Sequence, residues 1–271
     1  FTLAAFAAQG RDIKLAEDRI EGYRNFCNKL WNASRFVFMN LEDYKGSCAL
    51  DEKNNLSTAD CWILSRLNRA TKDVNEALEA FRFNDAALTV YKFIWNEYCD
   101  WYIELTKSKL TGSGPERVAA QNVLIHVLNS ALKLLHPFMP FITEEIWQKL
   151  PQNEDSIMVS TFPEFQEERT NAVVEKEMDT VMEVITGIRN IRGEMNLNPG
   201  LKLKVLVKTS SSEIQKILHA SDAYMPAAGS GFAASRLLAA VEFRTGPRVQ
   251  AAAWLRRRCP AEGGEGDGRC R

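Results

Sequence analysis

Apolar residues recur at spacings of three and four along most of the chain up to about residue 195, a spacing typical of one buried helix face. The first stripe predicts a helix that ends near Leu41, and its positions are Tyr23, Phe26, Leu30, Ala33, Val37 and Leu41. Four more residues widen this stripe on its flank: Cys27, Trp31, Ser34 and Phe38. We expect this half of the helix to be buried.

Further apolar stripes predict a mainly α fold that ends in a small α/β segment. The expected helices run over 57–78, 84–107, 118–135, 141–150 and 167–193, followed by a β-strand at 201–207 and a short helix at 213–218. Ser57 and Asp60 have the spacing of a capping box, in which two side chains satisfy free amides at a helix start. This pair predicts a sharp beginning for the second helix.

The stretch 84–107 has an unusual aromatic content, with Tyr91, Phe93, Trp95, Tyr98, Trp101 and Tyr102. Exposed rings could stack on unpaired RNA bases, which contributes about 1–3 kcal/mol per base. Core packing is the competing interpretation. It is favoured here because rings repeated at helical spacing are usually interior.

The side of the first helix opposite its apolar stripe is basic and rich in amides. Its members are Arg24, Asn25, Asn28, Lys29, Asn32 and Arg35. Guanidinium and ammonium groups can meet phosphates, while carboxamides offer donors and acceptors to base edges. Asn lowers helix propensity by about half a kcal/mol relative to Ala, so three within eight positions suggest a recognition surface. An ordinary solvated helix face is the alternative.

Composition limits how such a surface would work. The 271 residues are 45% hydrophobic and 25% charged, which is enough to bury one substantial core, but the net charge is only −1. A protein that holds RNA through its overall positive charge is therefore excluded, and any RNA contact must be local. The six cysteines form no CxxC pair, and we expect no metal site. No signal peptide or membrane span is visible, so a cytoplasmic protein without membrane contact is expected.

Four stretches of the sequence carry a family resemblance. They are YRNFCNKLWNASRF at 23–36, LSTADCWILSRLN at 56–68, FRFNDAALTVYKFIWNEYCDWYIELTK at 81–107 and HPFMPFITEEIWQKLP at 136–151. In this order and spacing they resemble the anticodon-binding helical domain of class I aminoacyl-tRNA synthetases, specifically the valine-tRNA ligase family. The resemblance extends to about residue 218.

The resemblance implies a domain organisation. Residues 1–16 would be a remnant of the linker after the catalytic core, and 17–151 a class Ia synthetase-type anticodon-binding bundle. Residues 152–218 would form a long helix plus the start of a small α/β segment. The stretch 219–271 is rich in Ala, Gly and Arg, matches nothing in the family, and is interpreted as an atypical tail with disorder expected after about residue 256.

Catalysis in this family depends on a nucleotide-binding core with the signatures HIGH and KMSKS, and neither occurs in this sequence. No catalytic residue is assigned, and the fragment alone is predicted to be inactive and to hold no cofactor. The resemblance implies that the intact parent joins valine to tRNA(Val) with ATP and Mg²⁺. The expected partners are tRNA(Val) and the missing catalytic and editing domains, in a monomeric enzyme.

A second group of candidates lies near the end of the long helix, in IRNIRGEMNLNPG at 188–200. The resemblance implies that Arg189, Asn190, Arg192 and Asn196 approach the tRNA backbone. Pairing of the arginines with the negative end of the helix dipole is the competing explanation.

Three hypotheses remain open at this point. The chain could be the RNA-recognition part of a valine-tRNA ligase, a self-sufficient ligase, or a helical module that binds proteins or RNA in general. The second is chemically weakest, because the sequence contains no recognisable site for ATP phosphates.

Overall fold

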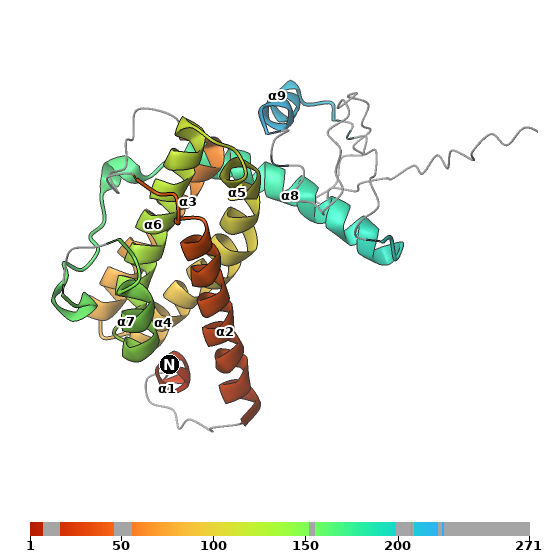
Figure 1. The fold of residues 1–271 in the computed structure, drawn as a ribbon. Coiled ribbons are helices and arrows are strands. Elements are labelled where there is room, and N and C mark those ends of the chain that lie inside the picture. Colours follow the sequence, from red (N-terminus) through yellow and green to blue (C-terminus); the bar gives the residue numbers. More distant parts are fainter. Residues whose placement is uncertain are drawn as a thin grey trace, which may run out of the picture. The chain divides into compact units, whose positions relative to one another are not determined.

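The computed structural model describes residues 1–7, 17–45, 56–151, 155–198, 207, 209–221 and 224. The chain divides into two compact units, Phe1–Met182 and Glu183–Arg271, and the first is a bundle of helices (Figure 1). No β-strand occurs among these described residues. The strand predicted at 201–207 lies outside them except for Val207, and so does most of the predicted tail.

Nine α-helices are present in the described part of the chain. They are α1 Thr2–Phe6, α2 Glu17–Met39, α3 Thr58–Glu79, α4 Phe83–Lys92, α5 Ile103–Leu110, α6 Pro115–Leu135, α7 Pro140–Trp147, α8 Ala172–Glu194 and α9 Ser212–Ala220. A π-helix at Phe93–Tyr102 joins α4 to α5, and 3₁₀ turns occur at Ile157–Val159 and Glu167–Arg169. The mainly α fold predicted from the sequence is confirmed.

The core of the first unit lies between α3, α6 and the continuous stretch from α4 to α5. Its largest fully buried side chains include Trp62, Trp147, Tyr98, Tyr102, Phe26 and Leu30. Because neighbouring helices alternate in direction, the turn from α3 to α4 and the turn from α6 to α7 lie at one end of the bundle (Figure 1). The helix α1 packs on α4 at this end, and the turn from α5 to α6 lies at the other.

The predicted capping box at the start of α3 is confirmed, and it extends into a buried polar network. The Ser57 hydroxyl accepts a hydrogen bond from the Asp60 amide, and the Asp60 carboxylate accepts one from the Ser57 amide at 2.8 Å. Asp60 is fully buried, and it also accepts from the Tyr102 hydroxyl at 2.8 Å and from Lys109 Nζ at 2.9 Å. One carboxylate therefore joins the start of α3 to the stretch that ends in α5.

The aromatic stretch packs mainly into the core, as its spacing predicts. Phe93, Tyr98 and Tyr102 are buried, whereas Tyr91 and Trp95 are partly exposed. The predicted single helix at 84–107 contains ten π-helical residues, Phe93–Tyr102, which the sequence analysis did not anticipate. In a π-helix the hydrogen bonds run from i to i+5, so residues five apart share a face that they would not share in an α-helix.

The start of the long helix differs most from the prediction. The long helix expected from residue 167 begins at Ala172, because the Asn171 side chain accepts from the Val174 amide at 3.1 Å and caps the helix there. A 3₁₀ turn occupies Glu167–Arg169, where the helix was expected to start, and another occupies Ile157–Val159.

Among the described helices, α6 has the length and apolar composition that a membrane span requires, but 61% of the relevant stretch is buried inside the structure. It begins directly after Gly114, whose φ of 99° lies in the region that favours glycine, and Pro115 occupies its first turn. Packing in the bundle core accounts for the hydrophobicity of α6.

Candidate nucleic-acid interface

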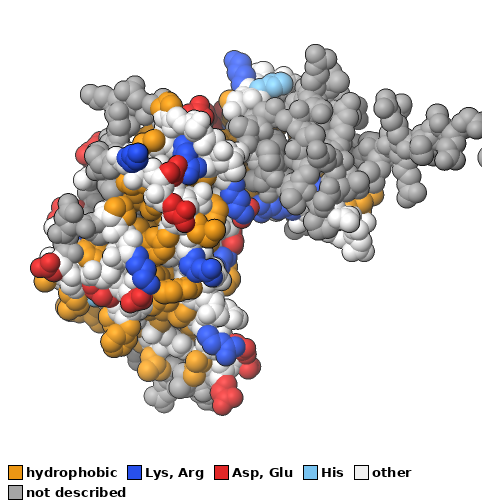
Figure 2. All heavy atoms as spheres, in the orientation of Figure 1, with side chains coloured by type: hydrophobic (Ala, Val, Ile, Leu, Met, Phe, Trp, Pro, Cys, Tyr) orange, Lys and Arg blue, Asp and Glu red, His pale blue; other side chains and the backbone are white. Residues whose placement is uncertain are grey.

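The exposed face of α2 presents a straight stripe of four residues. Arg24, Asn28, Trp31 and Arg35 follow one another at spacings of four, three and four, and all four are exposed. The stripe exists because Phe26, Leu30, Ala33 and Val37 turn the opposite face of the helix into the core. The face seen in Figure 2 carries Lys and Arg side chains spaced over α2, with hydrophobic atoms exposed between them.

Trp31 corrects the prediction from sequence, which placed its ring in the buried half of the helix. The residue is 37% exposed. Its spacing from Asn28 and Arg35 was the available signal, since i, i+3 and i+4 positions share a face. Tryptophan is on average a highly buried residue, so its place beside the apolar stripe predicted burial.

Of the six candidates on this helix, five are exposed and one, Lys29, is partly buried against the π-helix. Arg24, Asn25, Asn28, Asn32 and Arg35 are exposed. Lys29 is only 23% exposed, with its Nζ 2.5 Å from Asp100 and 3.8 Å from the centre of the Trp95 ring. Lys29 therefore joins α2 to the π-helix, and its charge is already paired.

Arg24 and Arg35 differ in whether a carboxylate pairs with them. Arg24 pairs with Glu21 one turn earlier at 2.7 Å, and both side chains are more than 60% exposed. Such an exposed pair is weak and exchanges easily for a phosphate. Arg35 has no ion-pair partner within the described part of the chain.

A hollow of about 320 Å³ opens beside Arg35. It is lined by Trp31, Ser34, Arg35, Phe38 and Lys149. The Lys149 ammonium lies 4.8 Å from the centre of the Trp31 ring and pairs with Glu145 at 2.6 Å. The hollow thus combines an exposed indole with two cations, which matches what a nucleotide requires: a ring for the base and positive charge for the phosphate.

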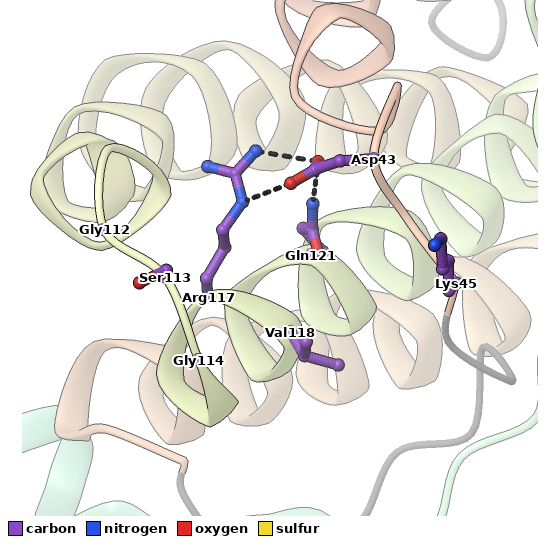
Figure 3. A pocket seen from close by; sticks show the side chains of 8 residues that line it. All are labelled: Asp43, Lys45, Gly112, Ser113, Gly114, Arg117, Val118 and Gln121. Atoms are coloured by element: carbon purple, nitrogen blue, oxygen red, sulfur yellow. Dashed lines mark hydrogen bonds and ion pairs between the residues drawn. The ribbon is translucent and has the colours of Figure 1, made fainter.

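A second hollow, of about 360 Å³, lies just beyond the C-terminal end of α2, beside the start of α6 (Figure 3). Arg117 and Gln121 converge on the Asp43 carboxylate, which accepts from Arg117 Nη2 at 2.8 Å and from Gln121 Nε2 at 3.1 Å. The Arg117 guanidinium holds the pKa of this carboxyl below its usual range. Because its arginine is neutralised by a bidentate pair, this hollow is less suited to a phosphate than the one beside Trp31.

A third hollow, of about 250 Å³, lies between α3, α6 and the segment 161–169. Its wall includes His126, and burial, assisted by the positive charge of Arg169, lowers the pKa of this imidazole to about 4. His136 lies elsewhere, with its Nδ1 2.7 Å from the Thr143 hydroxyl. That hydroxyl donates to the Met139 carbonyl at 2.8 Å, so the imidazole must donate to it, which gives His136 a structural role at the end of α6.

The candidates at the end of α8 occupy unlike environments. Asn190 and Asn196 are exposed, Arg189 is partly buried, and Arg192 is buried and donates to the Asn198 carbonyl at 3.1 Å. Asn196 has a φ of 48° and ends the helix: the Leu197 amide donates to the Arg192 carbonyl at 3.0 Å and the Asn196 amide to the Gly193 carbonyl at 3.1 Å. This arrangement is a Schellman motif, whose left-handed position tolerates asparagine.

The described ranges contain neither a metal site nor a reactive thiol. No three His, Cys, Asp or Glu side chains gather there in a way that could hold a metal ion. Burial raises the pKa of the Cys27 and Cys61 thiols, and it raises that of Cys99 to about 12. These three cysteines are therefore unsuited to act as nucleophiles at neutral pH.

Comparison with known proteins identifies the fold and its role. Residues 60–207 match the family model described as the anticodon-binding domain of tRNA ligase. The chain belongs to this family. The anticodon-binding domain of tRNA ligases therefore accounts for the bundle and for the resemblance found in the sequence, and its name implies tRNA as a partner.

The curated relatives specify which ligase this anticodon-binding domain resembles. Valine–tRNA ligase from Geobacter sulfurreducens is 54% identical over 228 residues, which is 83% of this chain and 26% of the relative. The enzymes of the same name from Syntrophotalea carbinolica and Thermotoga maritima are 48% and 50% identical, over 83% and 77% of this chain and 25% and 23% of theirs. The chain spans about a quarter of the length of these relatives and corresponds to the tRNA-recognition part of a valine-tRNA ligase.

Proposed function

We propose that this anticodon-binding domain holds the anticodon loop of tRNA(Val) against the exposed face of α2. The observation that carries the proposal is the hollow that an exposed ring, Trp31, lines together with the cations Arg35 and Lys149. A splayed base would stack on the indole, and the two cations would neutralise the phosphates on either side.

The remaining stripe would supply register and specificity. Arg24 would contact a phosphate one turn further along the loop, and the carboxamides of Asn28 and Asn32 would face base edges. Asn25 lies on the margin of this surface. Lys29 is left out, because its side chain is only 23% exposed in its pair with Asp100, whereas the pairs of Arg24 with Glu21 and of Lys149 with Glu145 are exposed and can exchange for a phosphate.

The domain would act as part of a longer enzyme. In the proposed parent, the part outside this chain activates valine with ATP and Mg²⁺ and transfers it to tRNA(Val), while this domain positions the RNA. We further propose that the parent is a monomer that works in the cytoplasm. The small net charge of −1 supports a domain that adds specificity to a larger enzyme over one that binds RNA by itself.

Direct binding to tRNA transcripts tests the proposal. Trp31→Ala should weaken binding of tRNA(Val) by about 5- to 150-fold, which corresponds to the loss of one base stack. Arg35→Gln should weaken binding of all RNAs to a similar degree and reduce the slope of log affinity against log salt by about 1. Asn28→Ala should mainly reduce the preference for the valine anticodon over other anticodons.

The matched control is Arg82→Gln, which removes an exposed arginine beside α4 that pairs with Asp85 at 2.9 Å. This variant should bind tRNA like the unchanged protein. If the Trp31 and Arg35 variants bind tRNA as tightly as the unchanged protein, the RNA site does not lie on α2. If the chain binds tRNA(Val), other tRNAs and duplex RNA with similarly weak affinity, the alternative function is favoured, a helical module that binds proteins or RNA in general.

A further inference from the structure

The hollow between α3, α6 and the segment 161–169 is polar, and we call it the His126 hollow. Its volume of about 250 Å³ exceeds several-fold the roughly 30 Å³ that one water occupies. Among the described residues that line it, none belongs to α2. Its polar lining includes partly exposed residues of α6 and of the segment, namely His126, Asn129, Ser130, Lys133 and Arg169. The hollow therefore gathers hydrogen-bonding groups around a space that fits a small molecule.

The segment that forms one wall of the His126 hollow is held in place by side chains of the two helices. The Asn68 carboxamide on α3 accepts from the Gln166 amide at 3.0 Å and donates to the Gln166 carbonyl at 2.7 Å, as a neighbouring β-strand would. Asn68 is only 5% exposed. Lys133 Nζ on α6 donates to the Thr161 carbonyl at 3.1 Å. These bonds fix the wall on both sides, so the hollow is formed before any ligand binds.

Several hydrogen-bonding groups of the His126 hollow have no partner. The Trp147 indole can only donate, and it bonds to Asn129 Oδ1 at 2.7 Å, which leaves the two donors of the Asn129 amide nitrogen. Within the described part of the chain, this nitrogen, the Ser130 hydroxyl and the His126 ring nitrogens are not hydrogen-bonded. None of these atoms is fully enclosed, so a ligand can reach them. The surplus of donors favours a ligand that accepts hydrogen bonds.

The charged groups of the His126 hollow favour an anion. The titratable and charged residues that line it are His126, Lys133, Glu164 and Arg169, and Glu164 is exposed. Because the pKa of His126 is lowered to about 4, its imidazole is neutral at pH 7 and supplies one donor without a charge. A phosphate group carries a charge of about −1.5 to −2 and three acceptor oxygens, which matches two cations and several neutral donors.

We propose that the His126 hollow binds the phosphate group of a small molecule. Arg169 and Lys133 neutralise its charge, and Asn129 and Ser130 donate to its oxygens. The inference does not rest on the RNA contact proposed for α2, because the residues that line the two hollows are different. The imidazole of His126 reports on binding, since an anion beside it stabilises its charged form and raises its pKa.

NMR of the histidine side chains in the 271-residue chain tests the proposal, with inorganic phosphate as the probe at constant ionic strength. The His126 signals should shift saturably, and phosphate should raise the pKa of this imidazole from about 4 to above about 5. His136 and His219 do not line the hollow, so their signals serve as internal references and should not change. Chloride at the same ionic strength should leave His126 unchanged.

Substitutions in the hollow separate a site from general electrostatics. Lys133→Gln and Arg169→Gln should each weaken phosphate binding at least about tenfold, and Ser130→Ala, which keeps every charge, by about 2- to 10-fold. Without phosphate, Arg169→Gln should raise the pKa of His126, because it removes a positive charge that lowers this pKa. Lys107→Gln on α5 is the matched control, since its side chain is exposed outside the hollow, and it should bind phosphate like the unchanged chain.

Four results would overturn the proposal. The first is an unshifted His126 signal at about 10 mM phosphate, tenfold above a millimolar Kd. The second is an equal shift with chloride or in all three histidines, which would show screening by salt. The third is unchanged phosphate affinity in both Lys133→Gln and Arg169→Gln. The fourth is displacement of the phosphate by a tRNA(Val) transcript, because the hollow would then belong to the RNA-binding surface.

Discussion

Lys29 on α2 and Asp100 on the π-helix form an ion pair with Nζ 2.5 Å from Oδ1, and the same ammonium lies over the ring of Trp95. Trp95 and Asp100 are five residues apart, and in an α-helix they would point in different directions. The i to i+5 hydrogen bonding of Phe93–Tyr102 brings both to one lysine. The π-helix therefore converts a lysine that the sequence assigns to RNA into a joint between two helices.

This joint predicts that stability and RNA affinity respond differently to two substitutions on α2. Lys29→Gln should lower the free energy of unfolding by about 1 kcal/mol, because a half-exposed ion pair and a cation–π contact are lost, and should change tRNA affinity by less than about twofold. Arg35→Gln should leave the free energy of unfolding nearly unchanged and should weaken tRNA binding. Urea titrations and tRNA-binding assays on both variants test this prediction. Lys107→Gln is the control for stability, because the Lys107 side chain is 49% exposed. A tenfold loss of tRNA affinity in Lys29→Gln would instead mean that Lys29 contacts the RNA.

The buried carboxylate of Asp60 should be the most sensitive charged position in the bundle. Asp60→Ala leaves Lys109 and the Tyr102 hydroxyl without their acceptor and removes the half of the capping box in which the Asp60 carboxylate accepts from the Ser57 amide. Loss of one member of a buried pair costs about 3–5 kcal/mol, so the urea midpoint should fall sharply. Asp73→Ala on the exposed side of the same helix is the matched control. If both variants unfold at the same urea concentration, the network does not stabilise the bundle.

His126 predicts a loss of stability in mild acid. Its pKa is lowered from 6.5 to about 4 in the folded protein, so the unfolded chain binds the proton first as the pH falls. The stabilisation is fully present above pH 6.5 and should decrease by about 2 kcal/mol by pH 5. Urea titrations between pH 7.5 and 5 should show this slope, and His126→Gln should flatten it. A slope that is identical in the variant would mean that other groups cause it.

Asn196 distinguishes the structural from the RNA-binding interpretation at the end of α8. If its φ of 48° is its main role, Asn196→Gly should leave both helix protection and tRNA affinity unchanged. Asn196→Ala should raise amide hydrogen exchange in the last turn of α8 by roughly fivefold, equivalent to about 1 kcal/mol of local strain. A fall in affinity with glycine, where the cap is preserved, would instead support the tRNA contact that the family resemblance implies.

The local elements and the family could be predicted from the sequence because both depend on residues close together in the chain. Apolar spacing located the helices to within a few residues, and Ser57 with Asp60 located the start of α3. The exposure of Arg24, Asn28 and Arg35 also followed, since a helix that buries Phe26 and Leu30 must turn those positions outward. The words of the sequence pointed to the valine-tRNA ligase family, which the comparisons confirm.

Contacts between distant residues decided the rest. The π-helix, the pairing of Lys29 with a carboxylate 71 positions away, and the exposure of Trp31 beside Lys149 depend on how α2 packs against its neighbours. A periodic pattern specifies which face of a helix is buried, but it does not specify which side chains of other helices meet the polar face. The sequence by itself therefore determined the bundle and the exposed polar face of α2, and the tertiary structure alone determined which cations on that face are already paired with a carboxylate.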